Sequence, residues 1–192
     1  MKREIFLFAA LLVGAASVRA EADAALKAGI FTPARMAPDF ALRGSDGAEL
    51  NLSRYRGKVV LLGFGFTSCA EVCPITLATL AQASKRLGAL ASELQIVYIT
   101  VDPERDDAAR MKKYLAAFNP AFIGGTGSAE QLAAVRKDYG ILAAKKIGAD
   151  SSYSHSSFVY LIDREGRLRA LMTYGRAADD YVHDVRILLG AP

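Results

Sequence analysis

The order of hydrophobic and polar positions first indicates a buried strand followed by a helix. An apolar run with few interruptions occupies residues 59–66, which favours a parallel strand covered on both faces over a half-solvated one. Thr67 and Ser68 end this run, and apolar positions then recur at helical spacing as far as Leu87. Pro74 suits a first helical turn, where its missing N–H has no partner to lose. The pattern predicts a central strand, a short turn and a helix.

Elements on either side of this unit predict an α/β fold with a layered sheet. A hairpin with glycine in its connection is expected over residues 40–52, before the central strand. A crossover through the helix, expected to be right-handed, leads to a second parallel strand. The other expected elements are helices at 108–118, 128–139 and 178–189, strands at 95–101, 121–123, 156–163 and 167–174, and an extended segment at 141–147.

The first residues carry the pattern of a secretory signal. Lys2 and Arg3 precede an apolar run, and residues 18–20 end in small side chains at the positions that a signal peptidase reads. We therefore expect residues 1–20 to be a cleaved signal peptide and the product to be exported, as a soluble periplasmic protein. The alternative is an uncleaved anchor, with residues 5–18 tethering the protein to the inner membrane.

Composition predicts one domain and argues against binding to nucleic acid. With 192 residues and 52% hydrophobic content, the chain can bury one core. We expect residues 21–36 to be a linker or flexible arm and residues 37–190 to form the domain. Three basic residues and one acidic residue of the predicted signal account for +2 of the formal charge of +4. The remaining charge of about +2 is too small to indicate nucleic acid or an anionic membrane.

The two cysteines of the chain lie around the predicted start of the helix that follows the central strand. The helix is expected to open at Cys73, with Cys69 in the turn before it. Backbone N–H groups and the helix dipole stabilise a thiolate there, which lowers its pKa below the free value of roughly 8.5. The pair therefore suits thiol chemistry or binding of a soft metal. A structural disulfide is the alternative in an exported protein, although so short a loop constrains the unfolded chain little.

The two histidines have different surroundings in the sequence. His183 lies with Asp184 on the polar side of the last predicted helix, as a solvated histidine would. His155 ends a polar loop just before a strand, where it either bonds to the neighbouring serines or meets the cysteine turn. In the second case, two thiolates and one imidazole would suit copper, since zinc would want a fourth ligand.

Three sequence runs together resemble the Sco/SenC family of copper chaperones. They are GFTSCAEVCP at Gly65–Pro74, DPERD at Asp102–Asp106 and YSHSSFVYLID at Tyr153–Asp163. An APDF opening at Ala37–Phe40 extends the similarity, which reaches to Leu189. Cysteine spacing, aspartate stretch and histidine all fall in the order of the family.

This resemblance implies a fold, a ligand set and a function. The fold would be a thioredoxin-like three-layer sandwich, with a central mixed sheet flanked by helices and an N-terminal β-hairpin extension. One copper ion, Cu(I) or Cu(II), would be bound by Cys69, Cys73 and His155. The protein would be a periplasmic metallochaperone that delivers copper to, or reduces the cysteines of, the CuA centre of cytochrome c oxidase. Its partners would be the copper-bearing subunit of that oxidase or another copper protein, and a thioredoxin-like reductant.

The aspartate stretch places Asp102 at the end of the second parallel strand, on the side where such folds bind ligands. We expect it either to cap the turn into the next helix or to support the metal site or a docking partner. Met111 and Met172 are further soft donors, but their helical and strand spacing assigns them to the core.

The chain departs from the usual family pattern between its cysteines. Ala70 and Glu71 stand where the family usually has proline and aspartate, which frees the backbone of the turn and adds an N–H group. The competing function is a thiol–disulfide oxidoreductase or peroxidase-like enzyme, with Cys69 as the attacking thiolate and Cys73 as the resolving thiol. A thioredoxin-fold interaction module with a structural disulfide is the third alternative.

Overall fold

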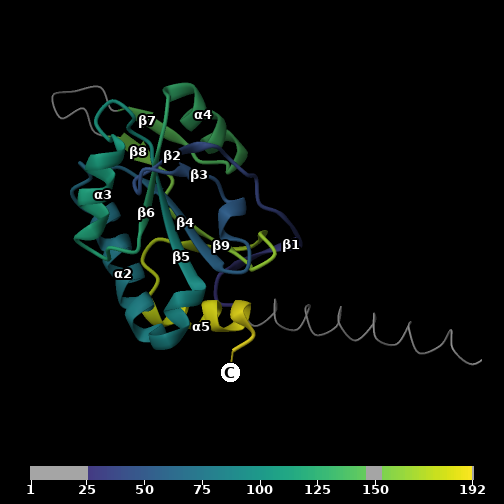
Figure 1. The fold of residues 1–192 in the computed structure, drawn as a ribbon. Helices are drawn as coiled ribbons and strands as arrows, with labels where there is room; N and C mark the ends of the chain where they lie inside the picture. Colours follow the sequence, from purple (N-terminus) through teal and green to yellow (C-terminus); the bar gives the residue numbers. More distant parts are fainter. Residues whose placement is uncertain (1–25, 146–152, 192) are drawn as a thin grey trace, which may run out of the picture.

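The computed structural model describes residues 26–145 and 153–191 (Figure 1). The predicted signal at 1–20 and most of the polar loop before His155 lie outside the described residues. The strands of the main sheet are β1 (Gly29–Met36), β2 (Leu42–Gly44), β3 (Glu49–Leu50), β4 (Val59–Gly65), β5 (Leu94–Thr100), β6 (Ile123–Thr126), β9 (Phe158–Ile162) and β10 (Arg167–Thr173). The helices are α2 (Val72–Leu87), α3 (Ala108–Ala116), α4 (Ala129–Asp138) and α5 (Ala178–Leu189), with short 3-10 helices at Ser53–Tyr55 and Gly88–Glu93.

The main sheet is mixed and has eight strands in the order β1-β10-β9-β4-β5-β6-β2-β3. Strands β4, β5 and β6 run parallel, while β9 pairs antiparallel with β4 and β2 pairs antiparallel with β6. All seven residues of β4 are buried, as its continuous apolar run predicted. A separate ribbon of β7 (Ala143–Lys145) and β8 (Tyr153–His155) lies at the end of the sheet away from α5 (Figure 1).

Helices cover both faces of the central strands. Gly124 of β6 faces Met111 and Leu115 of α3, and Gly65 of β4 faces Cys73 of α2. Because neighbouring residues of a strand point to opposite faces, Phe64 points away from α2. Its ring packs against Tyr139, the C-cap residue of α4. Helix α5 packs beside α2. The three layers confirm the predicted arrangement of a mixed sheet flanked by helices.

Several predicted elements are confirmed with small shifts in their bounds. The final helix has its predicted limits, the helix expected from residue 128 begins with Ser128 as its N-cap, and the hairpin β2–β3 is present. Helix α2 starts at Val72, one residue earlier than expected. Strand β6 takes in Gly124 and Gly125, which were expected to end it. These glycines fit inside the strand because each is closely approached by neighbouring side chains.

The expectation of a linker over residues 21–36 requires a correction. Residues 29–36 form strand β1, which pairs antiparallel with β10 at the edge of the main sheet. Most of its residues are exposed, so the segment lacks the hydrophobic pattern of a core strand, and backbone pairing holds it in place. Among the described residues, no helix is both long enough and apolar enough to cross a membrane.

A buried carboxylate anchors the start of the described chain. Asp184 of α5 was expected on the polar side of its helix, yet it is completely buried. Its two oxygens accept hydrogen bonds of 2.9 Å from the backbone N–H groups of Lys27 and Ala28. His183 beside it is 40% exposed in its side chain and contacts the same carboxylate. Asp184 therefore fixes the segment that leads into β1.

Replacing Asp184 with alanine should lower the free energy of unfolding by about 2 kcal/mol or more, because two backbone donors lose their acceptor. Urea denaturation of the two proteins measures this difference. Asp179→Ala is the matched control on the same helix, since that side chain is 75% exposed and, within the described part of the chain, pairs only with exposed Arg86. The control should change stability by less than about 0.5 kcal/mol. Equal effects of the two substitutions would contradict the anchoring role.

Candidate metal centre

The sulfur of Cys69 lies at the N-terminus of α2. The N-cap residue Glu71 makes no side-chain cap, and the N–H of Cys73 donates to the Cys69 sulfur over 3.4 Å. Partial burial acts to raise the pKa of the Cys69 thiol, but the N–H groups of Glu71, Val72 and Cys73 outweigh it and lower that pKa. The helix terminus thus favours the thiolate, as the sequence predicted.

Cys73 occupies the opposite kind of environment, since it is 1% exposed and packs against strand β4. A Cβ atom on Gly65 would lie 2.7 Å from its sulfur and 2.0 Å from the hydroxyl of Tyr98, so only glycine fits there. Burial raises the pKa of the Cys73 thiol to about 12, although hydrogen bonds from the Tyr98 hydroxyl and the Phe66 N–H act to lower it. The two thiols of one turn therefore differ strongly in acidity.

His155 reaches the cysteine turn through the β7–β8 ribbon. The ring of Phe66, just after β4, packs against Tyr153 and His155 of β8, with both centroid distances at 5.8 Å. The Nε2 atom of His155 stands 3.5 Å from the Cys73 sulfur, although the two residues are 82 positions apart. The structure therefore brings together two of the predicted site residues that sequence spacing could not connect.

The protonation of His155 follows from its second nitrogen. Nδ1 lies 2.9 Å from the carbonyl oxygen of Ser156, which can only accept, so Nδ1 carries the proton. Nε2 then presents its lone pair to the Cys73 thiol. Burial lowers the pKa of His155, and the bond to Ser156 only partly opposes this effect. A neutral imidazole with a free Nε2 is the form that binds metals.

A buried aspartate at the end of the DPERD run, Asp106, holds the cysteine turn in place. Asp106 is fully buried and accepts hydrogen bonds from the N–H and the hydroxyl of Thr67, at 2.9 and 2.5 Å, and from the hydroxyl of Thr100. Arg110 adds bonds to the hydroxyls of Thr67 and Ser68. The loop before Cys69 is thus tied to the end of β5. Position within the aspartate stretch was the only sequence signal for this role.

Asp102 is buried, with 1% of its surface exposed, and one of its oxygens accepts from the guanidinium of Arg105. Its other oxygen, Oδ1, has no hydrogen-bond partner among the described residues. Such burial leaves no surface for direct contact with a partner, and its support of the metal site stays a prediction. Met111 and Met172 are 1% and 0% exposed, which confirms that they belong to the core.

The donor set is partly assembled. Cys73 and His155 are in contact, and Cys69 lies against the backbone of Cys73 with its thiol free. Within the described ranges, no three His, Cys, Asp or Glu side chains stand close enough to hold a metal ion as they are. The chemistry of the donors nevertheless fits a soft ion, because two sulfurs and one imidazole nitrogen belong to the ligand types that copper takes.

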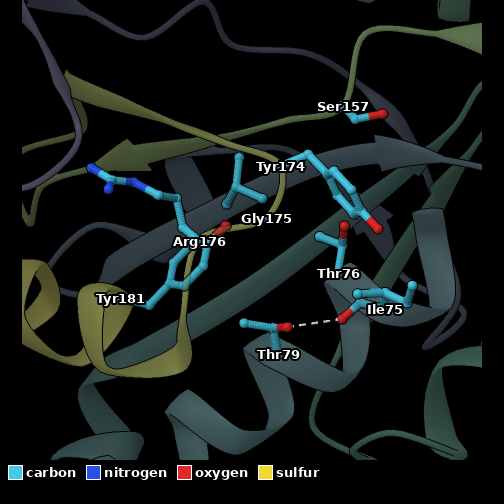
Figure 2. Close-up of a pocket in the computed structure, with 9 residues that line it drawn as sticks. Ile75, Thr76, Thr79, Ser157, Tyr174, Gly175, Arg176 and Tyr181 are labelled. Atoms are coloured by element: carbon cyan, nitrogen blue, oxygen red, sulfur yellow. Dashed lines mark hydrogen bonds between the residues drawn. The ribbon is translucent and has the colours of Figure 1, made fainter.

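A small cleft of about 100 Å³ opens beside this site, between α2 and the turn from β10 to α5 (Figure 2). Ile75 and Thr76 line it on α2, Tyr174 faces them from the turn, and Arg176 lines the cleft from the same turn with its side chain directed away from α2. Ile75 and Tyr174 are 51% and 45% exposed, which is unusual for side chains of their size. The flank of the thiol turn therefore presents apolar surface to solvent.

Comparison with known proteins identifies relatives of the whole described region. The sequence profile of the SCO1/SenC family matches residues 30–190. The mitochondrial SCO2 homologue of Mus musculus is 37% identical over 153 residues, which are 77% of this chain and 60% of that protein. The chain thus spans about three fifths of the length of this curated relative.

Solved structures show the same fold. Arabidopsis thaliana ScoI, determined with copper bound, has 30% identity and a TM-score of 0.74, covering 80% of this chain and 98% of its own. BsSco, described as having a disulfide switch and as a Sco-family cytochrome c oxidase assembly protein, has 25% identity and a TM-score of 0.69, covering 84% and 98%. The predicted thioredoxin-like fold is thereby confirmed.

Alkylation should separate the two thiols. In the reduced protein at pH 8, iodoacetamide should modify Cys69 at least about a hundredfold faster than Cys73, because the rate follows the thiolate fraction. The Cys69 rate should rise with pH through a midpoint below the ordinary thiol value. Mass spectrometry of Cys73→Ser and Cys69→Ser follows each thiol alone. Equal rates in the two variants would contradict the assigned difference in acidity.

Proposed function

The chain belongs to the SCO1/SenC family, and we propose that it binds one copper ion through Cys69, Cys73 and His155. The contact of 3.5 Å between the Cys73 sulfur and Nε2 of His155 carries this proposal. A half-buried imidazole and a buried thiol that meet across 82 residues serve no evident packing purpose that apolar side chains would not serve better. Copper bound to Arabidopsis thaliana ScoI supports the choice of metal.

The acidities of the three donors suit reversible metal binding. The pKa of Cys69 is lowered by the N–H groups at the helix start, and burial lowers the pKa of His155, so both donors reach their metal-binding forms more easily than free side chains would. Cys73 must release its proton to become a ligand, since the thiolate is the form that binds metals. Binding is therefore coupled to proton release, at least from Cys73, and affinity for copper rises with pH. Two thiolates favour Cu(I), while the added imidazole also suits Cu(II).

The proposed role is that of a metallochaperone and not of an enzyme with turnover. Copper would leave by ligand exchange, with thiolates of a partner replacing Cys69 and Cys73 in turn. The assembly role stated for BsSco supports cytochrome c oxidase as the destination. We propose that the protein delivers copper to the CuA centre in the copper-bearing subunit of the oxidase, or reduces the cysteines of that centre. Another copper protein is the alternative recipient.

The proposed location is the periplasm. The signal pattern of residues 1–20 supports export, and tethering by residues 5–18 is the alternative. An oxidising compartment would convert Cys69 and Cys73 to a disulfide, which cannot bind copper as two thiolates. A thioredoxin-like reductant would therefore be needed to return the pair to its dithiol form.

Titration of the reduced protein with Cu(I) tests the ligand set. The wild type should bind one equivalent, and Cys69→Ser/Cys73→Ser should bind none. His155→Ala should lower the affinity at least about tenfold, because one of three ligands is lost. Affinity is measured by competition with a chromophoric Cu(I) chelator. His183→Ala is the matched control and should bind as the wild type does, since that side chain lies on α5 beside Asp184.

Two results would overturn the proposed site. Failure of the wild type to bind Cu(I) would remove the copper function. Unchanged affinity in His155→Ala would reduce the site to the two cysteines and leave the contact with His155 without a role in metal binding.

The unequal acidity of the thiols supports a second function, thiol–disulfide exchange. The Cys69 thiolate would attack a substrate disulfide and release one substrate thiolate. Cys73, after losing its proton, would attack the mixed disulfide, release the second thiolate and leave a Cys69–Cys73 bond. A dithiol reductant would return the two electrons. The disulfide switch stated for BsSco supports such chemistry.

An assay with a model disulfide substrate separates the two functions. If the protein is an oxidoreductase, catalytic reduction should occur in the wild type and survive His155→Ala, because this chemistry needs only Cys69 and Cys73. Turnover should disappear in Cys69→Ser, where the attacking thiolate is missing. Stoichiometric reduction without turnover would count against the enzyme.

A further inference from the structure

We propose that Tyr98 is a positioning residue, whose buried hydroxyl donates a hydrogen bond to the Cys73 sulfur and thereby favours the reduced, copper-binding state of the cysteine pair. Tyr98 lies in the middle of β5 and is 2% exposed. The copper-related part of this proposal rests on the proposed function, whereas the effect of Tyr98 on the cysteine pair can be tested without copper.

Strand β4 is shaped to let this hydroxyl reach the sulfur. Gly63 pairs with Tyr98 across the parallel strands, and a Cβ there would lie 2.9 Å from the tyrosine ring. One pleat further on, a Cβ on Gly65 would lie 2.0 Å from the hydroxyl and 2.7 Å from the sulfur. Two glycines in an otherwise bulky, fully buried strand thus form a slot that directs the hydroxyl of Tyr98 at Cys73.

The groups around the Cys73 sulfur determine how strong the hydrogen bond from Tyr98 is and whether it can be removed separately. The Tyr98 hydroxyl and the Cys73 sulfur border the same small space beside Gly65, and Nε2 of His155 stands 3.5 Å from that sulfur. The backbone N–H of Phe66 is a second donor near the sulfur. The N–H of Phe66 belongs to the backbone and is present with any side chain. A substitution at Tyr98 can therefore remove the hydroxyl donor and leave the backbone donor in place. Because the hydroxyl and the sulfur are both buried, a hydrogen bond between them is stronger than it would be in water.

Formation of the Cys69–Cys73 disulfide works against this hydrogen bond. Each thiol loses a proton, two electrons pass to an oxidant, and one S–S bond forms between the two sulfurs. The Cys73 sulfur must then turn toward Cys69, and a disulfide sulfur accepts hydrogen bonds more weakly than a thiol or thiolate. The buried hydroxyl of Tyr98 is left without its partner, which costs free energy. Tyr98 therefore shifts the equilibrium toward the dithiol.

The same bond strengthens copper binding. A metal-bound thiolate carries negative charge, and a hydrogen bond from a neutral donor stabilises that charge. Hydrogen bonding around a cysteine ligand also tunes the electronic properties of a copper site. With Tyr98 in place, charge transfer from sulfur to Cu(II) requires more energy, because the sulfur electrons are held more tightly.

Tyr98→Phe removes the hydroxyl and keeps the ring in its slot. Copper-free protein is equilibrated with mixtures of reduced and oxidised dithiothreitol, and the fraction of disulfide is measured by thiol trapping. The variant should favour the disulfide by about threefold to tenfold. Tyr160→Phe is the matched control, because Tyr160 is also buried and donates its hydroxyl to the carbonyl oxygen of Tyr139. This control should leave the equilibrium unchanged.

Copper-loaded protein provides the second measurement. Tyr98→Phe should bind Cu(I) about tenfold or more weakly, and its Cu(II) charge-transfer band should move to longer wavelength. A merely structural role would not shift this band in a variant that unfolds as the wild type does.

A dithiol equilibrium that matches the Tyr160→Phe control would overturn the proposal, whether or not the wild type binds copper. Unchanged affinity and band position would overturn its copper-related part. Absence of copper binding in the wild type would refute the proposed function and leave the dithiol result decisive for Tyr98.

Discussion

The close approach of the first turn of α2 to strand β4 is the constraint on which the site depends. Cys73 packs directly over Gly65, where any Cβ would collide with its sulfur. This contact buries one thiol while the helix start leaves the other half-exposed. A single turn therefore contains one thiol whose pKa the helix start lowers and one whose pKa burial raises. Sequence spacing alone treats the two as equivalent.

Buried carboxylates hold the parts of the fold that the hydrophobic core does not specify. Asp106 fixes the loop before Cys69, and Asp184 fixes the segment before β1. In both cases the acceptor is a carboxylate and the donors include backbone N–H groups of a distant segment. Burial of a charge is costly, and several hydrogen bonds to each carboxylate offset that cost. Both residues thus hold a backbone segment in position: Asp106 the cysteine loop, and Asp184 the segment that leads to the sheet edge.

The fold explains how the imidazole of His155 reaches the thiols although no single helix or strand connects them. His155 ends a short ribbon that lies outside the main sheet, and the ring of Phe66 is its contact with β4. Nδ1 is held by the carbonyl oxygen of Ser156, the residue directly after the ribbon. The histidine is therefore orientated locally and brought to the sulfur by packing.

The sequence by itself determined the central strand, the helix start between the cysteines and the C-terminal hairpin and helix, because hydrophobic periodicity and capping residues are local signals. It also identified Cys69, Cys73 and His155 as candidates, through their motifs. Only the tertiary structure decided that His155 meets Cys73, that β1 joins the sheet, and that Asp184 is buried. Each of these depends on contacts between residues far apart in the chain, for which local patterns carry no information. The slot for Tyr98 is an intermediate case, since Gly63 and Gly65 stand out in a bulky strand, yet their partner lies on another strand.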